Sequence, residues 1–363
     1  MRIAEFQEFL RKEKIDFALF ASNSLNKKDK NITYFTGTDI EECFLCIPKS
    51  GRVLFFISRL EEEKTRKKLG VKDEAGKKNG IKLMVPEKTV FDEMKNLFKS
   101  PSRIGVNNEI FSLKENDELK KRFDAEIVDV SGFCRKLREI KTVEEINLIR
   151  KSCRISDKIM ADCVDNFRKF NTETDVKNFI KNGVHSLNVK EAFEPIVASG
   201  KNASVPHYES QNVKLRKGFC IIDLGVKYRE YCSDLTRTFY IGNPSIREIK
   251  MYNTLLKAQE YAIASAGAGA IASDVDKKTR NSLGDFNRYF IHSLGHQLGV
   301  EIHENNSFRL SINCDRKLKK NMVFAIEPGI YEESKWGLRI EDTVLVSEKV
   351  LCLTKYPKKF KYV

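Results

Sequence analysis

The stretch that decides the fold runs from Ile222-Asp223-Leu224-Gly225 to Ser233-Asp234-Leu235-Thr236-Arg237-Thr238, with its two aspartates eleven residues apart. Both aspartates stand in apolar, strand-like runs, where a buried carboxylate without a partner is strongly destabilising. Strand periodicity puts each carboxylate on a single face of its strand. The short connection at residues 226–231 makes the two strands antiparallel partners, so the two carboxylates can meet.

Three further residues repeat this pattern of a charged or metal-binding side chain in an apolar run. They are His296 in Gly295-His296-Gln297-Leu298-Gly299, Glu327 in Ala325-Ile326-Glu327-Pro328-Gly329, and Glu341 in Leu338-Arg339-Ile340-Glu341-Asp342. Pro328 removes a ladder hydrogen bond and is expected to end regular pairing beside Glu327. A single histidine is more often an ordinary core residue, but four acids in matching contexts favour one metal centre.

The chemistry of the expected ligands indicates the kind of metal. Four carboxylates and one imidazole form a hard, oxygen-rich set that favours Mn²⁺ over a thiolate-type zinc site. A single ion seldom needs four carboxylates. Two ions about 3.5 to 4 Å apart can share bridging carboxylates and activate a water. We therefore expect two divalent ions, Mn²⁺ in the first place, with Co²⁺ or Zn²⁺ as alternatives.

Length and composition set outer bounds on the fold. The chain has 363 residues, long enough for two domains, and 41% hydrophobic with 32% charged residues is typical of a globular protein. We find no run of about 18 apolar residues. Residues 1–10 alternate charged with apolar side chains at helical spacing, unlike a secretion signal. The sequence predicts a cytoplasmic protein without a membrane partner.

The cysteines and the net charge exclude two other classes. Nine cysteines lie without regular spacing between Cys43 and Cys352, which is typical of reduced thiols. Cys43 and Cys46 form a lone CxxC in an apolar run, which favours a buried structural pair. The net charge is +14, with basic clusters at 27–30, 64–82 and 316–320. Acidic residues interrupt the longest cluster and aromatic residues do not alternate with it, so we expect solvated faces and no nucleic-acid partner.

Residues 1–125 predict a small N-terminal α/β domain. Strand-like runs at 17–21, 32–35, 44–48 and 52–57 occur with helical patterns at 3–10, 90–98 and 112–123. Ser112 and Glu115 form a capping box at the start of the last helix. Nothing in this domain resembles a reactive site.

Residues 126–363 predict an α+β domain. A capping box at Thr142 and Glu145 opens a long helix, and a second helix covers 173–187. Helical patterns also occur at 245–266 and 274–283. The remaining strand-like runs are 193–198, 219–224, 233–241, 322–330 and 338–346. Helices combined with hairpin-like strand pairs are typical of an α+β fold.

The segments around the five expected ligands resemble the pita-bread metallopeptidases, specifically the Xaa-Pro dipeptidase (prolidase) and aminopeptidase P branch. The matching strings are Ile-Asp-Leu-Gly, Tyr-Cys-Ser-Asp-Leu-Thr-Arg-Thr-Phe, His-Ser-Leu-Gly-His-Gln-Leu-Gly-Val-Glu-Ile-His-Glu, Met-Val-Phe-Ala-Ile-Glu-Pro-Gly-Ile-Tyr and Gly-Leu-Arg-Ile-Glu-Asp-Thr. The resemblance covers about residues 130 to 350, and the preceding domain is similar to the amino-terminal domain of that branch. It implies a C-terminal pita-bread fold behind a smaller creatinase-like domain.

The resemblance also implies roles for the five ligands. Asp223 is expected to bind one metal, and His296 and Glu327 the other. Asp234 and Glu341 are expected to bridge both ions. Glu327 is expected to act as a proton shuttle for the water as well.

Five further residues receive roles by resemblance. His207 is similar to the histidine beside the proline subsite, and His303 to the one that hydrogen-bonds the scissile carbonyl. His292 and Arg339 are similar to residues that orient the site. Arg309 falls close to where prolidases place a carboxylate-binding arginine. The family often has glycine after the ligand histidine, whereas this chain has Gln297, which bears on pocket shape.

The resemblance implies a dinuclear-metal exopeptidase that hydrolyses the Xaa-Pro bond of short proline-containing peptides. Arg309 slightly favours a dipeptidase over an aminopeptidase that acts on longer peptides. A methionine aminopeptidase shares the five ligands, but the substantial N-terminal domain argues against it. A non-catalytic binding module on the same fold is expected to have lost ligands, and here all five are present. Members of this branch are commonly dimers, so we expect a homodimer.

Overall fold

The structure is a computed structural model that describes residues 2–22, 28–70, 77–78 and 80–363. The chain divides into two compact units, Met1–Leu137 and Arg138–Val363. The sequence predicted a division between residues 125 and 126. The observed division lies later because β7 (Glu126–Asp129) pairs with β6 (Arg103–Val106) inside the N-terminal sheet. Among the described residues, no helix combines the length and apolar character that a membrane crossing requires.

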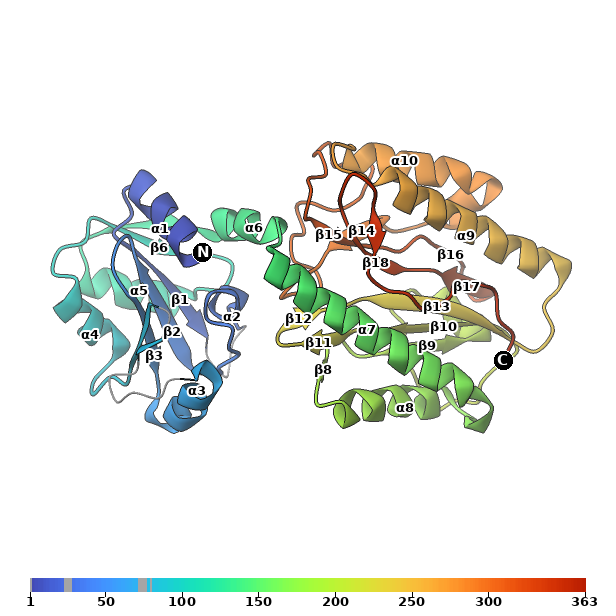
Figure 1. Cartoon of the computed structure of the whole chain (residues 1–363), viewed down its shortest axis with the longest axis horizontal. Helices are drawn as coiled ribbons and strands as arrows, with labels where there is room; N and C mark the ends of the chain where they lie inside the picture. Colours follow the sequence, from blue (N-terminus) through green and yellow to red (C-terminus); the bar gives the residue numbers. More distant parts are fainter. Residues whose placement is uncertain (1, 23–27, 71–76, 79) are drawn as a thin grey trace. The chain divides into compact units, whose positions relative to one another are not determined.

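The N-terminal unit is built on a seven-stranded sheet in the order β4-β5-β3-β2-β1-β6-β7. Figure 1 labels β1, β2, β3 and β6 of this sheet. Its antiparallel centre is β1-β2-β3, and parallel strands flank that centre on both sides. Apolar side chains from the strands and from α4 and α5 form the core. The other bounds are α1 Arg2–Lys12, β1 Phe17–Ser22, α2 Lys30–Thr36, β2 Cys43–Pro48, β3 Val53–Ile57, η1 Arg59–Glu61, α3 Glu62–Leu69, β4 Lys77–Lys78, β5 Ile81–Met84, α4 Val90–Leu97, α5 Leu113–Arg122 and α6 Ser131–Glu139.

The prediction of a strand at residues 32–35 is wrong, because these residues lie in helix α2. The Asp29 side chain accepts a hydrogen bond from the Asn31 N–H and caps the helix start. Gly37 ends the helix in the left-handed conformation, with φ at 71°. Ile32, Tyr34 and Phe35 are buried. Local caps and burial therefore override the strand preference of these β-branched and aromatic residues.

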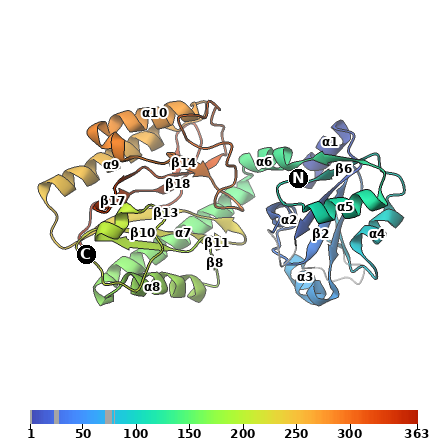
Figure 2. The ribbon, with the colours of Figure 1, turned by 180° about the vertical axis from the view of Figure 1, so that it is seen from behind.

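The C-terminal unit places short sheets between two pairs of helices, as Figures 1 and 2 show. Side chains of α7 and α8 pack on β10 and β13, while α9 and α10 cover the sheet that contains β15 and β18. The helices are α7 Val143–Asp165, η2 Phe167–Lys169, α8 Glu173–Ser186, η3 Gly200–Ser204, α9 Ile246–Ser265, α10 Ala272–Ser282 and η4 Gly284–Tyr289. The strands are β8 Lys190–Glu191, β9 Ile196–Ser199, β10 Gly218–Leu224, β11 Val226–Tyr228, β12 Tyr231–Cys232, β13 Leu235–Ile241, β14 Gly295–Gln297, β15 Val323–Ile326, β16 Gly329–Glu332, β17 Trp336–Arg339, β18 Asp342–Leu345 and β19 Leu351–Cys352.

Strands β10 and β13 are antiparallel partners, as the sequence predicted, and Asp223 lies opposite Thr236. Their connection is not a simple turn, because β11 and β12 form a small sheet of their own with β8. Two predicted strands are each broken in the middle. Residues 322–330 divide into β15 and β16 at Glu327-Pro328, and residues 338–346 divide into β17 and β18 at Ile340-Glu341. Both breaks put an acid at a strand end, where regular backbone pairing stops.

The cysteines are free thiols, eight of them buried and Cys352 half-buried. Cys43 and Cys46 are both buried on β2, as the sequence predicted for that motif. Burial raises the pKa of both thiols well above the ordinary range. These two residues are therefore structural side chains of the N-terminal core.

Candidate metal centre

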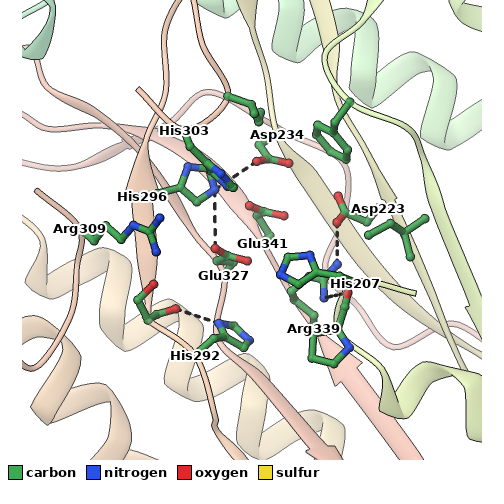
Figure 3. A pocket seen from close by; sticks show the side chains of 15 residues that line it. His207, Asp223, Asp234, His292, His296, His303, Arg309, Glu327, Arg339 and Glu341 are labelled. Atoms are coloured by element: carbon green, nitrogen blue, oxygen red, sulfur yellow. Dashed lines mark hydrogen bonds and ion pairs between the residues drawn. The ribbon is translucent and has the colours of Figure 1, made fainter. Parts of the chain in front are cut away.

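A cavity of about 240 Å³ opens in the C-terminal unit (Figure 3). Its walls are built from the ends of β10, β13, β14, β15 and β17, together with the loops that follow them. The ten residues that the sequence singled out all line this cavity: His207, Asp223, Asp234, His292, His296, His303, Arg309, Glu327, Arg339 and Glu341. Residues far apart in the chain therefore meet at one place.

Three of the expected ligands form a tight cluster. Asp234, His296 and Glu341 are buried, and one ligand atom from each lies within 4.8 Å of the others. His296 Nε2 is 3.4 Å from Asp234 Oδ2 and 3.6 Å from Glu327 Oε1. Asp223 belongs to the opposite wall, where its Oδ2 accepts a hydrogen bond from Arg339 at 2.6 Å. Carboxylate oxygens therefore face the cavity from more than one of its walls.

Close backbone packing positions the imidazole. Gly295 precedes His296 in β14, and a Cβ at this position would collide with the carbonyl oxygen of Ala325 on β15. Glycine therefore lets the two strands approach at the point where His296 turns toward the cavity. The His296 Nδ1 atom lies 3.3 Å from the Gln297 carbonyl oxygen. A proton on Nδ1 leaves Nε2 available as a ligand atom.

Two carboxylate oxygens at the site are buried without a hydrogen-bond donor in the described part of the chain. They are Asp223 Oδ1 and Glu341 Oε1. Burial, together with the neighbouring carboxylates, raises the pKa of Glu341 well above its ordinary value. Burial also raises the pKa values of Asp223 and Glu327. This crowding of negative charge is unfavourable in the protein alone.

The donor set fits divalent cations. Orphaned carboxylate oxygens and a correctly oriented imidazole nitrogen supply hard ligand atoms, and a cation would relieve the repulsion that raises the pKa values. Asp223 and Glu327 lie on different sides of the Asp234–Glu341 pair in Figure 3. The donor set therefore fits divalent cations in kind, and the assignment of the individual ligands stays a prediction.

Arg339 joins the walls of the site. Its guanidinium donates to Asp223, to Thr236 Oγ1 at 3.2 Å and to the Tyr331 hydroxyl at 2.9 Å. The pKa of this buried Arg339 is raised because neighbouring acids outweigh the burial that would lower it. Thr236 donates to Glu341 Oε2 at 2.6 Å. The same network therefore orients two of the expected metal ligands.

The sequence prediction missed Thr236 and Tyr331 as parts of this network. Tyr331 lies on β16, and its hydroxyl is 3.3 Å from His292 Nε2. Both residues stood next to expected ligands, in Asp234-Leu235-Thr236 and in Glu327-Pro328-Gly329-Ile330-Tyr331. Alternation along the strand puts Thr236 on the same face as Asp234 and could have identified it. The break at Pro328 hides the corresponding signal for Tyr331.

The three other histidines that line the cavity differ in burial. The ring of His303 meets the ring of His296 edge-on, with centroids 4.2 Å apart. Burial lowers the pKa of His303 to about 4 and that of His292 to about 4. Both rings are therefore neutral near pH 7. His207 is exposed and faces the cavity beside Arg339 and Asp223 (Figure 3).

Arg309 lies at the cavity wall, whereas Gln297 does not. Arg309 lines it, and one terminal nitrogen donates to Asn306 Oδ1 at 2.7 Å. Its Nε has no acceptor in the described part of the chain. Gln297 is buried on the opposite face of β14 from His296, and it does not line the cavity. The departure at Gln297 therefore leaves the pocket wall untouched.

Comparisons with known proteins agree with this geometry. The sequence profile of metallopeptidase family M24 matches residues 147–348. The profile of the creatinase/prolidase N-terminal domain matches residues 2–140. The predicted family and the predicted two-domain architecture are confirmed by these matches.

Individual relatives match along nearly the whole chain. A protein named Xaa-Pro dipeptidase from Pyrococcus furiosus is 32% identical over 96% of this chain and 95% of its own. The structure of an Xaa-Pro dipeptidase from Bacillus anthracis superposes with a TM-score of 0.88 at 27% identity, covering 100% of this chain and 99% of that one. The X-Pro aminopeptidase from Thermotoga maritima has a TM-score of 0.86 at 26% identity, covering 97% of this chain and 100% of that one. The chain is therefore a member of metallopeptidase family M24, with the creatinase/prolidase type of N-terminal domain in front of its peptidase domain.

Proposed function

We propose that this protein is a metal-dependent exopeptidase that hydrolyses the bond between an N-terminal residue and proline. Dipeptides of the Xaa-Pro type are the favoured substrates. The expected metal ligands in this proposal are Asp223, Asp234, His296, Glu327 and Glu341. Relatives that cover nearly the whole chain bear the names Xaa-Pro dipeptidase and X-Pro aminopeptidase, which supports this substrate class.

One observation carries the proposal. Asp223 and Glu341 at the cavity each keep one buried oxygen without a donor among the described residues, and neutral histidines and two arginines line the same space. Several carboxylates that repel one another at one cavity are unfavourable without a cation, which supports a metal site. Divalent ions at such a site lower the pKa of water and polarise a carbonyl group.

Glu327 is the proposed proton shuttle. Its carboxylate lies at the cavity, next to His296, and a carboxylate in this position can accept and return a proton. In the proposed reaction, a Glu327 oxygen takes a proton from the attacking water. The same oxygen then delivers the proton to the prolyl nitrogen as the peptide bond breaks.

The histidines bind the peptide around that step. His303 is neutral near pH 7 and can donate a ring N–H to the carbonyl oxygen as negative charge develops there. His207 is proposed to contact the proline side of the substrate from the cavity rim. His292 and Arg339 hold the site through Tyr331 and Asp223.

Arg309 supports the preference for dipeptides. Its Nε has no acceptor among the described residues, so the guanidinium has donors available for a carboxylate at the cavity. The substrate carboxylate of an Xaa-Pro dipeptide follows directly after the proline ring. In a longer peptide that position is an amide, which gains less from a guanidinium.

Three further properties are proposed. Manganese is the proposed metal because the ligands are mainly carboxylates. A reducing, cytoplasmic setting is supported by the free cysteines. A homodimer is proposed by resemblance to the branch, and short proline-containing peptides are the proposed partners in place of nucleic acid.

The proposed function is tested with purified protein that has been stripped of metal. Hydrolysis of Ala-Pro and Ala-Pro-Ala is measured with and without added Mn²⁺. We expect Mn²⁺-dependent cleavage, with the larger kcat/KM on Ala-Pro. A larger kcat/KM on Ala-Pro-Ala would assign an aminopeptidase instead.

Two variants serve as controls for this assay. Arg309→Leu is expected to lower kcat/KM for Ala-Pro more than for Ala-Pro-Ala, because it removes the proposed carboxylate contact. Glu260→Gln, an exposed residue on α9, is expected to change neither. Absence of Mn²⁺-dependent cleavage of both peptides by the unaltered protein would overturn the proposed function.

A further inference from the structure

The segment that carries His207 is held by contacts that lie outside the metal cluster. Residues 205–210 follow η3 and belong to no helix or strand. On the cavity side, the carbonyl oxygen of Pro206 accepts a hydrogen bond from Arg339 at 3.3 Å. Figure 3 shows His207 beside that arginine. A second contact, on the side of the segment that faces away from the cavity, would be needed to hold the His207 imidazole in one position.

Glu173 lies on that other side as a fully buried acid, with 0% of its surface exposed. It is the first residue of α8, where the helix dipole favours a negative charge. Its Oε1 accepts hydrogen bonds from the Ser199 N–H at 2.8 Å, the Ser199 hydroxyl at 2.9 Å and Asn202 Nδ2 at 3.0 Å. These donors are uncharged, and two of the three are side chains. A buried carboxylate with this arrangement organises the polar groups around it.

Asn202 connects this acid to Tyr208. Its Nδ2 also donates to the Tyr208 hydroxyl oxygen at 2.8 Å. Burial and the nearby Glu173 carboxylate raise the pKa of Tyr208 to about 12, so the hydroxyl keeps its proton at neutral pH. The Tyr208 ring packs against the apolar cluster that includes Ile221 and Tyr331. Tyr208 is therefore fixed at its hydroxyl and along its ring.

We propose that Glu173, Asn202 and Tyr208 form a latch that positions His207 and thereby sets affinity for the proline side of the substrate. His207 lies between its two anchors in the chain, the Pro206 carbonyl and the Tyr208 side chain. Each anchor restrains the backbone one residue away. These are positioning residues, because the contacts described run through Tyr208 to the segment and the latch does not line the cavity. The inference rests on the proposed function for its kinetic consequence alone.

The main test is a double-mutant cycle on Ala-Pro hydrolysis with Mn²⁺. Tyr208→Phe removes the hydroxyl and keeps the ring. We expect its KM to rise roughly fivefold, the effect of about one hydrogen bond, while kcat stays within about twofold. In a His207→Ala background, Tyr208→Phe is expected to cause no further rise in KM, since both act through one side chain. Tyr261→Phe, on an exposed tyrosine of α9, is the matched control.

Hydrogen exchange gives a readout that does not depend on catalysis. Loss of the latch is expected to speed amide exchange across residues 199–210 in Tyr208→Phe and in Glu173→Gln. Mn²⁺ affinity measured by calorimetry is expected to stay unchanged in Tyr208→Phe. Should Glu173→Gln fold poorly, Tyr208→Phe still decides the question.

The outcomes separate the latch from the proposed function. An unchanged KM in Tyr208→Phe, an equal rise in both backgrounds, or unchanged exchange at residues 199–210 would each overturn the latch. If the unaltered protein does not cleave Ala-Pro, the proposed function fails and the exchange measurement alone decides the latch. Faster exchange confined to residues 199–210 would then still support it.

Discussion

The capping acid Asp29 of the N-terminal unit and the cavity acids of the C-terminal unit are hydrogen-bonded in opposite ways. In the N-terminal unit, Asp29 is 2% exposed, and its two oxygens accept hydrogen bonds from Asn31 N–H and Asn107 Nδ2. In the C-terminal unit, Asp223 and Glu341 are equally buried, yet each keeps one oxygen without a donor in the described part of the chain. The first acid supports the fold with internal partners. Each of the others has an oxygen that could accept a cation as a further partner.

This difference distinguishes acids that stabilise the fold from acids that are expected to bind metal. An acid whose hydrogen bonds are complete stabilises its unit whatever ions are present. Acids that repel one another destabilise their unit until cations neutralise them. The comparison therefore predicts that metal binding affects the stability and the activity of the C-terminal unit. The stability of the N-terminal unit is expected not to depend on metal.

The largest contrast is expected between Glu327→Gln and Asp29→Asn in the Ala-Pro assay. Glu327→Gln keeps the shape of the side chain but removes the group proposed to move the proton. We expect kcat to fall by about 10² to 10⁴. Asp29→Asn is expected to leave kcat within about twofold, since Asp29 lies in the other unit. A Glu327→Gln enzyme with unchanged kcat would remove the proposed shuttle.

Metal removal is expected to destabilise one unit alone. Saturating Mn²⁺ at 100 to 1,000 times its Kd stabilises the folded state by about 3 to 4 kcal/mol. Trp336 is the single tryptophan of the chain and lies in the C-terminal unit, so its fluorescence reports that unit. We expect chelation by EDTA to lower the melting temperature seen by Trp336.

Amide exchange in β1 is the matching measurement for the N-terminal unit. It is expected to be the same with and without EDTA. Equal destabilisation of β1 would contradict the division between the two units. An unchanged Trp336 transition would argue against bound metal.

A smaller effect is expected from the cap of α2. Asp29→Ala removes the acceptor for Asn31 and for Asn107, and we expect it to destabilise the N-terminal unit by about 1 to 2 kcal/mol. Mn²⁺ affinity should not change. Asp124→Ala, at an exposed position, is the matched control and should have little effect on the unfolding midpoint in urea. A loss of Mn²⁺ binding in Asp29→Ala would contradict the claim that metal binding does not involve the N-terminal unit.

The smallest effect is a dependence of N-terminal stability on acid pH through Asp16. Burial would raise the pKa of Asp16, but hydrogen bonds from Lys49, Arg103 and Ser102 lower it from 3.8 to about 2. The unfolded chain therefore binds the proton more readily than the folded one. The stability from this carboxylate is present above pH 3.8 and is lost as the pH falls toward 2.

Because Asp16 is partly exposed, we expect its contribution to be about 1 kcal/mol after solvent screening. Amide exchange in β1 of the unaltered protein and of Asp16→Asn should differ at pH 6 and converge near pH 2. A difference between the two proteins that grows as the pH falls would have the wrong sign.

Much of the site could be predicted from sequence because its residues stand out locally. An acid in an apolar run, such as Asp223 or Glu341, is anomalous whatever surrounds it. Capping boxes at Thr142 and Ser112 likewise depend on neighbours along the chain, and both are observed. Local patterns of this kind need no knowledge of the fold.

Other features depend on contacts that the sequence does not display. Residues 32–35 have strand-forming side chains, but burial and the caps at Asp29 and Gly37 decide for a helix. The parallel strands β5, β6 and β7 are short and were not predicted, since their pairing partners lie far away in the chain. Tyr331 was missed because the strand is broken at Pro328. Strand β16 pairs with β17 in a sheet separate from that of β15, so side-chain alternation counted from Glu327 does not apply to it. The misses at β5, β6, β7 and Tyr331 therefore have their origin in tertiary structure, whereas the caps of α2 are local signals.

The central claim is that cations complete the buried acids of the C-terminal unit. The most direct test is anomalous diffraction at the manganese edge from crystals grown with Mn²⁺. We expect two peaks about 3.5 to 4 Å apart, between Asp234 and Glu341, with Asp223 beside one peak and His296 beside the other. A well-ordered map with no peak among these side chains would contradict the claim.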